Sequence, residues 1–408
     1  MALPKCISLL LFIVLLISSR AVAVSSSSSS SSSSGDNDCG IKAVYSFGDS
    51  IADTGNLLRE GVDNTSFSSI ARLPYGETTF GYPTGRCSNG LLMIDFIAKD
   101  LGLPYLNPYL EKDANFTYGV NFAVAGATAL DASFFAEKGM MIPFTNSSLH
   151  VQLGWFKSHL KTICSSEEDC GERMRHALFM VGEIGGNDYN YAFFGKKPIQ
   201  EVATIVPYVV GSIITAAKEL LDMGAVRLVI PGNFPIGCIP AYLTLVNSVN
   251  PSAYDENDCL IDLNTFAMLH NVKLQKAIEV LRLLYPNAVI AYADYFRAFL
   301  YILNNADKLE HTCKFDLFMF NALITDCFEG FNKKFLHQAC CGGGGGYNFD
   351  AAAMCGAPGT SVDRNPSSFV SWDGIHLTQE AYRIMEKQLF GGGYTYPSIE
   401  LTKLAKCQ

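Results

Sequence analysis

A serine at the end of an apolar segment is the first residue of this sequence with potential for chemistry. Ser50 follows the strand-like residues 43–47 and the turn-forming pair Gly48 and Asp49. This pattern predicts a strand that ends in a turn, and Ser50 would then lie at the carboxyl end of a sheet, where open α/β sheets place their ligand sites. A serine hydroxyl is a weak nucleophile by itself. The hypothesis therefore requires a base, a group that orients the base, and donors for an oxyanion.

Three later stretches contain residues of the required types. Asp373 stands three residues before His376, close enough for one loop to hold the carboxylate against the imidazole. Asn187 follows a Gly-Gly turn after another strand-like run, and Gly126 lies in the stretch Asn-Phe-Ala-Val-Ala-Gly-Ala-Thr. A glycine there lets its backbone N–H approach a ligand closely. Gly-Asp-Ser alone is more often an ordinary turn, but the three later stretches together favour catalysis.

These residues suffice for acyl transfer without a cofactor or a metal ion. His376 would accept the proton of Ser50 as the hydroxyl attacks an ester carbonyl, and Asp373 would fix the tautomer and stabilise the imidazolium. Water as the acceptor of the acyl group gives hydrolysis, and a bound alcohol gives acyl transfer. The sequence leaves both outcomes open.

In these four stretches, in their order and spacing, the chain resembles the plant GDSL esterases and lipases of the SGNH hydrolase superfamily. The likeness covers essentially the whole chain after its leader. It implies Ser50 as the nucleophile, His376 as the base and Asp373 as its partner, with Ser50, Gly126 and Asn187 forming the oxyanion hole. It also implies a three-layer α/β/α fold, flavodoxin-like, around a mostly parallel sheet. Ile51 replaces the leucine of the family name at a position that does no chemistry.

The chain looks most like the branch that includes acetylajmalan esterase and sinapine esterase. This resemblance implies a secreted serine ester hydrolase that cleaves a small acyl ester, for example an acetyl ester, of a plant specialised metabolite such as an alkaloid. An acyltransferase with the same acyl-enzyme and a lipase are the alternatives, although nothing in the sequence indicates a long-chain channel or a lid. An inactive binding protein is a third alternative, and the five intact site residues argue against it.

The first residues of the sequence are typical of a secretory signal. Lys5 precedes an apolar core, and Ala21-Val22-Ala23 matches a cleavage site, so residues 1–23 are predicted to be a signal peptide. The apolar run is too short to span a bilayer, and no stable membrane anchor is expected. Removal of Lys5 and Arg20 would make the formal net charge two units more negative than −9. The final compartment, whether extracellular, vacuolar or the endoplasmic reticulum lumen, stays open.

An acidic chain with a pI near 5.3 is not expected to bind nucleic acid. The predicted partner is the small-molecule acyl ester, and the protein is expected to be a monomer. The serine-rich residues 24–38 cannot contribute to a core, so they are interpreted as a disordered leader. Alternating helical and strand-like patterns over residues 39–408 predict one α/β domain.

The alternating pattern also predicts individual elements. Strands are expected at 176–184, 227–231 and 288–293 and an extended segment at 369–372; helices are expected at 90–100 capped by Asn89, at 199–223, at 259–285, from Asp294 and from Thr378. The apolar stretch at 199–223 is interpreted as a core helix, kinked by Pro207 and Gly211, rather than a membrane span.

The mature region keeps 12 of 13 cysteines, which in a secreted chain indicates disulfides. Cys164 and Cys170 are expected to close a small loop, and Cys238 and Cys259 to flank a longer segment. Cys340 and Cys341 are adjacent and are not expected to pair with each other. No metal site is predicted, because a set of His337, Cys340, Cys341 and Cys355 matches no zinc spacing. Glycosylation acceptors occur at Asn64, Asn115 and Asn146.

Several polar and aromatic residues near these motifs receive structural interpretations. Asp49 and Asp188 are predicted to stabilise turns, and Asp53 and Asn56 to shape the loop after Ser50 through local hydrogen bonds. The six other histidines, none closely preceded by an aspartate, are predicted to be structural: His150, His159, His176, His270, His311 and His337. The aromatic residues Phe122, Tyr189 and Trp372 are expected in the core.

Overall fold

A six-stranded sheet lies at the centre of the unit that spans residues 38–408. The strands are β1 Ala43–Phe47, β2 Gly119–Asn121, β3 Ala177–Val181, β4 Arg227–Pro231, β5 Val289–Ala293 and β10 Thr395–Tyr396. Their order in the sheet is β10-β5-β4-β3-β1-β2, and only β10 runs antiparallel to its neighbour. Every residue of β3 is buried. Apolar runs of this kind are typical of parallel strands that are covered on both faces.

The computed structural model describes residues 40–61, 68–309, 312–313, 327–328 and 330–405. The predicted signal peptide at 1–23 and the leader at 24–38 lie outside the described residues. Two small two-stranded sheets complete the strands of the described part. They are formed by β6 Thr312–Cys313 with β7 Cys327–Phe328 and by β8 Cys341–Gly342 with β9 Ser361–Val362.

The strand order places a topological switch point between β1 and β3. The chain leaves β1 for β2 on one side and then crosses to β3 on the other, so the two connections diverge from this point. In open α/β sheets, ligands bind in the crevice outside the carboxyl ends of the strands at such a point. The turn that contains Ser50 follows β1, and the Gly-Gly-Asn turn follows β3. The topology therefore brings the two motifs to one edge of the sheet.

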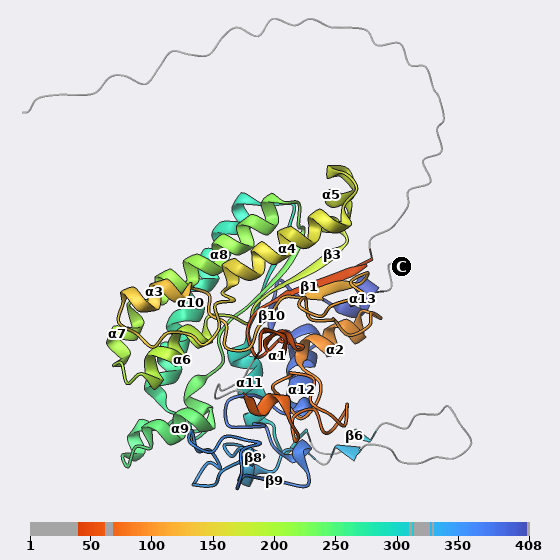
Figure 1. Ribbon diagram of the computed structural model, residues 1–408. Helices are drawn as coiled ribbons and strands as arrows, with labels where there is room; N and C mark the ends of the chain where they lie inside the picture. The colour runs from red at the N-terminus through yellow and green to blue at the C-terminus, as the bar shows by residue number, and fades with distance from the viewer. Residues whose placement is uncertain (1–39, 62–67, 310–311, 314–326, 329, 406–408) are drawn as a thin grey trace, which may run out of the picture. The chain divides into compact units, whose positions relative to one another are not determined.

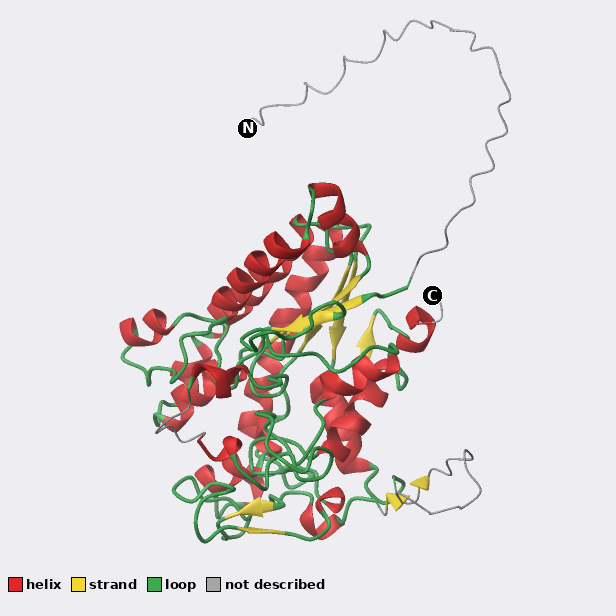
Figure 2. Ribbon diagram, turned by 45° about the vertical axis from the view of Figure 1, so that its right-hand side comes forward, coloured by secondary structure: helices red, strands yellow, loops and turns green. Residues whose placement is uncertain are grey.

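Helices cover both faces of the sheet (Figures 1 and 2). One layer contains α4 Leu149–Ile163, α8 Val206–Asp222 and α10 Ile261–Leu284; the other contains α2 Met93–Asp100, α11 Tyr295–Asn304, α12 Gln379–Phe390 and α13 Leu401–Ala405. The predicted three-layer α/β/α fold with a mostly parallel sheet is thereby confirmed. The shorter helices are α1 Asn56–Glu60, α3 Ala132–Glu137, α5 Glu167–Arg175, α6 Gly186–Phe194, α7 Ile199–Ala203 and α9 Pro240–Val246.

Side-chain caps fix the start of several helices. The Ser148 hydroxyl accepts a hydrogen bond from the Val151 amide at the start of α4, and the Asp294 carboxylate accepts one from Arg297 at the start of α11. Thr378 does the same for the Ala381 amide at the start of α12. Each cap satisfies a backbone donor that the helix cannot satisfy itself. The predicted helix starts at Asp294 and Thr378 were correct.

Three predicted elements differ from the structure. The helix expected from residue 90 begins at Met93, because the Asp95 carboxylate accepts from the Leu92 amide and Asn89 instead accepts a hydrogen bond from the Gln379 amide. Residues 369–372, expected as a last strand or an extended segment, form no strand of the described sheets, although Phe369 has an extended backbone. Ser371 forms only isolated bridges to Ala339 and Leu377.

The helix expected at 199–223 is two helices, α7 and α8, with the break before Pro207 rather than a kink at Gly211. Among the described residues, the stretch Ile199–Asp222 is the only helical one long and apolar enough to cross a membrane by length and composition. Buried residues such as Val209, Ile213 and Ala217 lie on α8, which packs against α4, α10 and β3. Core helices of globular proteins pass the same test of length and composition, and the packing agrees with the predicted core helix.

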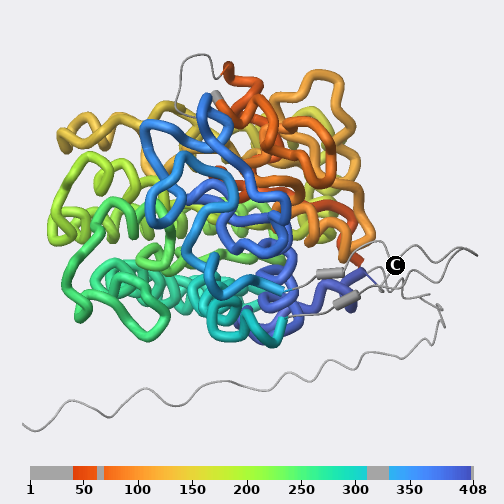
Figure 3. The backbone as a smooth tube through the Cα atoms, turned by 90° about the horizontal axis from the view of Figure 1, so that it is seen from below, coloured from red at the N-terminus to blue at the C-terminus, as the bar shows by residue number. Residues whose placement is uncertain are grey.

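A loop-rich segment, residues 331–378, follows β7 and contains β8 and β9. In Figure 3 this blue segment lies across the end of the unit seen from below. The Cys341–Cys355 disulfide closes a loop within it, and the same loop contains the run of five glycines from Gly342 to Gly346. A cross-link is useful here, because glycine-rich chain loses much conformational freedom when it is ordered.

The described cysteines agree with the expectations from spacing. Disulfides join Cys164 to Cys170 and Cys238 to Cys259, and Cys340 does not pair with Cys341. Cys87 and Cys340 are buried free thiols. Because Cys341 and Cys355 are bonded to each other, they do not ligate a metal, and no cluster with metal-ligand composition occurs within the described ranges.

We predict that a Cys341→Ala/Cys355→Ala double variant loses about 3 kcal/mol of unfolding free energy, the value expected for a cross-link that closes a loop of about 15 residues. Urea unfolding of the purified protein measures this loss. The matched control is Cys164→Ala/Cys170→Ala, whose disulfide joins residues only six apart in sequence. An equal or larger loss in the control would contradict the loop-length argument.

Candidate active site

Ser50 is held by the turn that ends β1. Gly48 has a φ of +150°, and a Cβ there would lie 2.6 Å from the Glu183 carbonyl oxygen, so only glycine fits. The Gln152 side chain of α4 accepts from the Gly48 amide at 2.9 Å and donates to its carbonyl at 2.8 Å. These contacts restrict the backbone of the turn to few conformations, and Ser50 is therefore fixed relative to the sheet.

Asp53 holds the loop after Ser50. Its carboxylate accepts hydrogen bonds from four backbone amides: Gly55 at 2.6 Å, Asn56 at 2.6 Å, Leu57 at 3.0 Å and Ala125 at 2.8 Å. The first three bonds are the predicted local contacts, and the fourth joins the loop to the segment that contains Gly126. The prediction of local hydrogen bonds was wrong for the Asn56 side chain, which donates to the distant carbonyl groups of Asn121 and Ala123 and accepts from the Leu110 amide. Burial raises the pKa of Asp53 to about 6, although the amides act in the opposite direction.

Ser50, His376 and Asp373 form one continuous chain of hydrogen bonds. The Ser50 Oγ lies 2.8 Å from His376 Nε2, and His376 Nδ1 lies 2.7 Å from Asp373 Oδ2. A carboxylate only accepts hydrogen bonds, so Nδ1 carries the proton and Nε2 can accept the proton of Ser50. Ser50 is 6% exposed, and His376 and Asp373 are each 1% exposed. The three residues that sequence spacing suggested therefore meet in a geometry suited to nucleophile activation.

Asp373 is ionised in spite of its burial. Burial alone would raise the pKa of its carboxyl group, but His376 and the amides of Ile375 and His376 lower this pKa below its ordinary value. The Tyr75 hydroxyl also donates to Asp373 Oδ2, at 2.9 Å. Tyr75 is 1% exposed and lies 298 positions from Asp373 in sequence. Sequence reasoning missed Tyr75, because no local pattern links two residues so far apart.

Asn187 lies at the start of α6 and lines the same cavities as Ser50. Its Nδ2 donates to Asp49 Oδ2 at 3.2 Å and to the Ala127 carbonyl at 3.0 Å, and its Oδ1 accepts from Asn190. The amide is therefore oriented with its donor side toward the turn that contains Ser50. For Asn187 to donate to an oxyanion, one of these two hydrogen bonds must be exchanged for a bond to substrate.

Gly126 has a φ of +81°, and its carbonyl accepts a hydrogen bond from the Tyr191 hydroxyl. A Cβ at this position would lie 2.0 Å from the Phe144 ring, so a side chain does not fit. Its segment is fixed on both sides, since Ala125 donates to Asp53 and Ala127 accepts from Asn187. Gly126 does not line the cavities of the described residues that contain Ser50.

Three acidic side chains, Asp49, Glu183 and Asp188, are buried beneath the nucleophile. Burial raises the pKa of all three carboxyl groups, that of Asp188 to about 7, and their mutual repulsion acts in the same direction. Asp49 accepts from the Ile51 amide, as a turn stabiliser should. Asp188 does not serve the turn predicted for it. It accepts from Ala129 at 2.8 Å and Leu130 at 3.0 Å and thus joins α6 to a distant loop.

Two cavities meet at Ser50. The larger has a volume of about 600 Å³ and is lined by His376, by Phe144 and by the glycine-rich loop at 343–345. The smaller has a volume of about 60 Å³ and extends toward Glu183. Both are lined by Ser50 and Asn187, so a bound molecule in either could reach the nucleophile.

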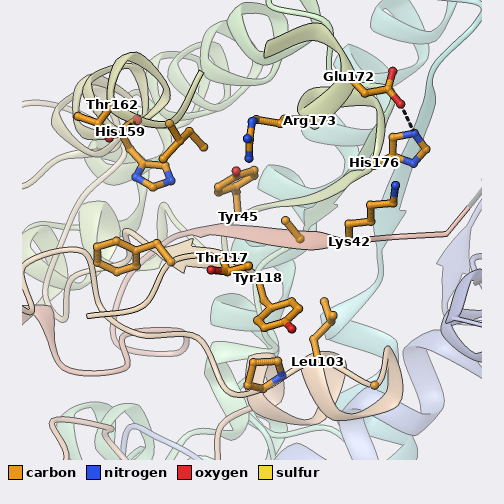
Figure 4. A pocket seen from close by; sticks show the side chains of 15 residues that line it. Lys42, Tyr45, Leu103, Thr117, Tyr118, His159, Thr162, Glu172, Arg173 and His176 are labelled. Carbon is orange, nitrogen blue, oxygen red and sulfur yellow. Dashed lines mark hydrogen bonds and ion pairs between the residues drawn. The ribbon is translucent and has the colours of Figure 1, made fainter. Parts of the chain in front are cut away.

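A hollow larger than both of these cavities lies elsewhere on the described surface. A groove of about 1450 Å³ is lined by residues at the amino ends of β1 and β3, among them Lys42, Tyr45, Arg173 and His176 (Figure 4). This edge of the sheet is opposite to the carboxyl ends that hold Ser50. The candidate active site is therefore located by the hydrogen bonds that join Ser50, His376 and Asp373, and not by the volume of a cavity.

The remaining residues of interest lie away from these cavities. Asn115 and Asn146 are exposed, as a glycosylation acceptor must be, and Asn64 lies outside the described residues. Phe122, Tyr189 and Trp372 are each at most 1% exposed and belong to the core, as predicted. His337 contacts the carbonyl groups of Cys238 and Asn257.

Comparison with known proteins gives a consistent result. Residues 44–389 match the model of the GDSL-like Lipase/Acylhydrolase family. The chain is 41% identical over 354 residues to a Rauvolfia serpentina protein named acetylajmalan esterase, covering 87% of this chain and 86% of that protein. It is 44% identical over 366 residues to an Arabidopsis thaliana protein named GDSL esterase/lipase, covering 89% of this chain and 85% of that protein.

We predict that the stability of the protein decreases as the pH rises from about 4 to about 7. In this range the unfolded chain has already released the protons of Asp49, Glu183 and Asp188, whereas the folded chain still holds them up to the raised pKa of each group, which is about 7 for Asp49 and Asp188. The buried histidines His159 and His270, with pKa values lowered by burial to about 4 and about 3, oppose this trend up to about pH 6.5, but they are two groups against three. Thermal unfolding as a function of pH measures the effect.

A Glu183→Gln variant provides the control for this pH dependence. Glutamine resembles the protonated carboxyl group and does not ionise, so the variant should lose less stability with rising pH than the original chain. A melting temperature that increases over this range, or an unchanged slope in the variant, would argue against a protonated cluster.

We predict that Tyr75→Phe lowers kcat for a nitrophenyl ester by about tenfold with little change in KM, because a hydrogen bond to a charged group contributes about 1.5–3 kcal/mol. The phenyl ring keeps the packing of Tyr75 against Trp372, so the fold should be retained. The matched control is Tyr292→Phe, which removes a buried hydroxyl that forms no hydrogen bond to the triad. Equal activity of the two variants would show that Tyr75 does not position Asp373.

Proposed function

The chain belongs to the GDSL-like lipase/acylhydrolase family, a family of carboxylic ester hydrolases, and we propose that it cleaves its ester through Ser50 as an acyl-enzyme. The observation that supports this mechanism best is the hydrogen-bonded chain from Ser50 through His376 to Asp373. A buried serine whose hydroxyl faces an imidazole nitrogen, with the imidazole itself paired with a buried carboxylate, is the arrangement that activates serine for acyl transfer.

In the proposed reaction, His376 removes the proton of Ser50 as Oγ attacks the ester carbonyl. The oxyanion of the tetrahedral intermediate accepts hydrogen bonds from the backbone amides of Ser50 and Gly126 and from the Asn187 side chain. His376 then donates the proton to the departing alcohol, and the acyl group stays on Ser50. Water, deprotonated by His376, releases the acid in the second half of the cycle.

Asp373 acts on His376 throughout this cycle. It holds His376 in the tautomer that accepts at Nε2, and it stabilises the imidazolium after proton transfer. The four donors to its carboxylate keep it ionised and oriented: Tyr75, Ile375, and the amide and imidazole of His376. A water-poor site strengthens both effects, because charges interact more strongly where the dielectric constant is low.

The proposed substrate is a small acyl ester, such as an acetyl ester, of a plant specialised metabolite of the alkaloid type. The support is the identity of 41% to proteins named acetylajmalan esterase. We also propose that residues 1–23 direct the chain into the secretory pathway and that Asn64, Asn115 and Asn146 carry glycans. The disulfides of the described residues are compatible with an oxidising compartment. The protein would act as a monomer, without a membrane anchor.

Hydrolysis of nitrophenyl esters by purified protein tests the proposal. We predict that Ser50→Ala lowers kcat/KM by about 10⁴-fold or more, since loss of a nucleophile in such a triad removes most of the catalysis. The matched control is Ser46→Ala, four residues earlier on β1, where a fully buried hydroxyl has no partner among the described residues. This variant should keep its activity.

Equal rates for Ser50→Ala and the original chain would refute catalysis by Ser50. Product analysis in the presence of an added alcohol distinguishes the hydrolase from an acyltransferase, because only the latter forms a new ester in excess water.

A further inference from the structure

The two cavities that meet at Ser50 differ in one respect that matters for catalysis. They share a wall formed by Ser50, Asn187, Asn190, Phe194, Ala241 and Ile375. His376 lines only the larger cavity, and Asp49 and Glu183 line only the smaller. A molecule bound across Ser50 therefore has one part beside the imidazole and the other part away from it.

The position of His376 decides which part of an ester lies on which side. When the tetrahedral intermediate on Ser50 collapses, the departing alkoxide must receive its proton from His376 Nε2. The alcohol portion of the ester therefore has to lie beside the imidazole. That portion belongs in the cavity of about 600 Å³. The acyl portion then extends from the carbonyl carbon in the other direction, into the cavity of about 60 Å³.

We propose that the small cavity beside Ser50, bounded by Ile236, Glu183 and Asn233, is the acyl pocket of this enzyme and restricts it to acyl groups of about two to four carbons. This inference rests on the proposed function and specifies which part of the ester each cavity binds.

The volume of the small cavity supports a limit on acyl length. At about 60 Å³ it has about a tenth of the volume of the large cavity, which is about 600 Å³. The smaller part of the ester therefore belongs in the small cavity, and a lengthening acyl chain fills that cavity first.

The chemistry of the cavity wall supports the same limit. Apolar side chains surround the space near Ser50, among them Ile51, Ile239 and Leu377. Glu183 and Asn233, which are 5% and 2% exposed, contribute polar groups to the same wall. Asn233 Oδ1 has no hydrogen-bond partner among the described residues. A longer alkyl chain would cover these groups without satisfying them, which is unfavourable.

Ile236 is the best position at which to change the size of this cavity. It belongs to the short 3-10 helix Ile236–Cys238, is only partly buried, and lines the small cavity but not the large one. Met354 is the matched position, because it is partly buried and lines only the large cavity. Neither residue contacts the triad through a hydrogen bond, so both variants should fold with the triad intact.

The experiment measures kcat/KM for nitrophenyl esters from acetate to decanoate, with the alcohol portion held constant. The original chain should prefer acetate to butanoate and lose activity from hexanoate onward. Ile236→Ala should raise the ratio of hexanoate to acetate by about tenfold, since one or two methylene groups in a pocket change rates to this extent. Ile236→Phe should shift the preference further toward acetate, and Met354→Ala should leave the profile of acyl lengths unchanged.

A second series holds the acyl group at acetyl and varies the size of the alcohol. Met354→Ala, and not Ile236→Ala, should change this profile. Hydrolysis that depends on Ser50 but remains flat up to decanoate, or whose acyl profile responds to Met354→Ala instead of Ile236→Ala, would overturn the acyl pocket and leave the proposed function standing. Absence of any hydrolysis that depends on Ser50 would overturn both.

Discussion

The Asp53 carboxylate is the interaction on which the rest of the site depends. It accepts four backbone amides, three from the loop after Ser50 and one from Ala125 in the segment of Gly126. Backbone groups of loops are usually satisfied by water, and water would weaken every charge interaction at the nucleophile. One buried side chain satisfies them instead. The nucleophile loop and the predicted oxyanion segment are thereby joined without solvent, and Asn56 strengthens the junction by donating to the carbonyl groups of Asn121 and Ala123.

The topology explains why such a junction can form at this place. Ser50 follows β1, Asn121 ends the neighbouring β2, and the Gly-Gly-Asn turn follows β3, so three loops leave adjacent strands at one edge. The triad is completed from a different direction. His376 and Asp373 belong to the segment before α12, which packs against α2 and α11 on one face of the sheet. Ser50 and His376 are 326 positions apart in sequence, and only the packing of that layer brings them together.

Features that depend on local pattern could be predicted from the sequence, and features that depend on distant contacts could not. The apolar run of Arg227–Pro231, the capping residues Asp294 and Thr378 and the short spacing of Asp373 and His376 are local, and the structure agrees with each prediction. Tyr75 and Gln152 left no such signal, because each acts on a residue of another element. Asn89 shows the converse error. It has the composition of a helix cap, but a tertiary partner, the Gln379 amide, occupies its side chain.

The buried acidic cluster could not be predicted from the sequence, because its members look like ordinary turn residues. Asp49, Glu183 and Asp188 come together only because β1 and β3 are neighbours, and their burial favours the neutral forms. A neutral cluster has one consequence that an ionised one lacks. Negative charges beneath Ser50 would oppose the oxyanion that forms on the substrate, so protonation of these groups removes a repulsion that would otherwise act against the transition state. The carboxylate of Asp373 is bonded directly to His376, where its charge favours the imidazolium.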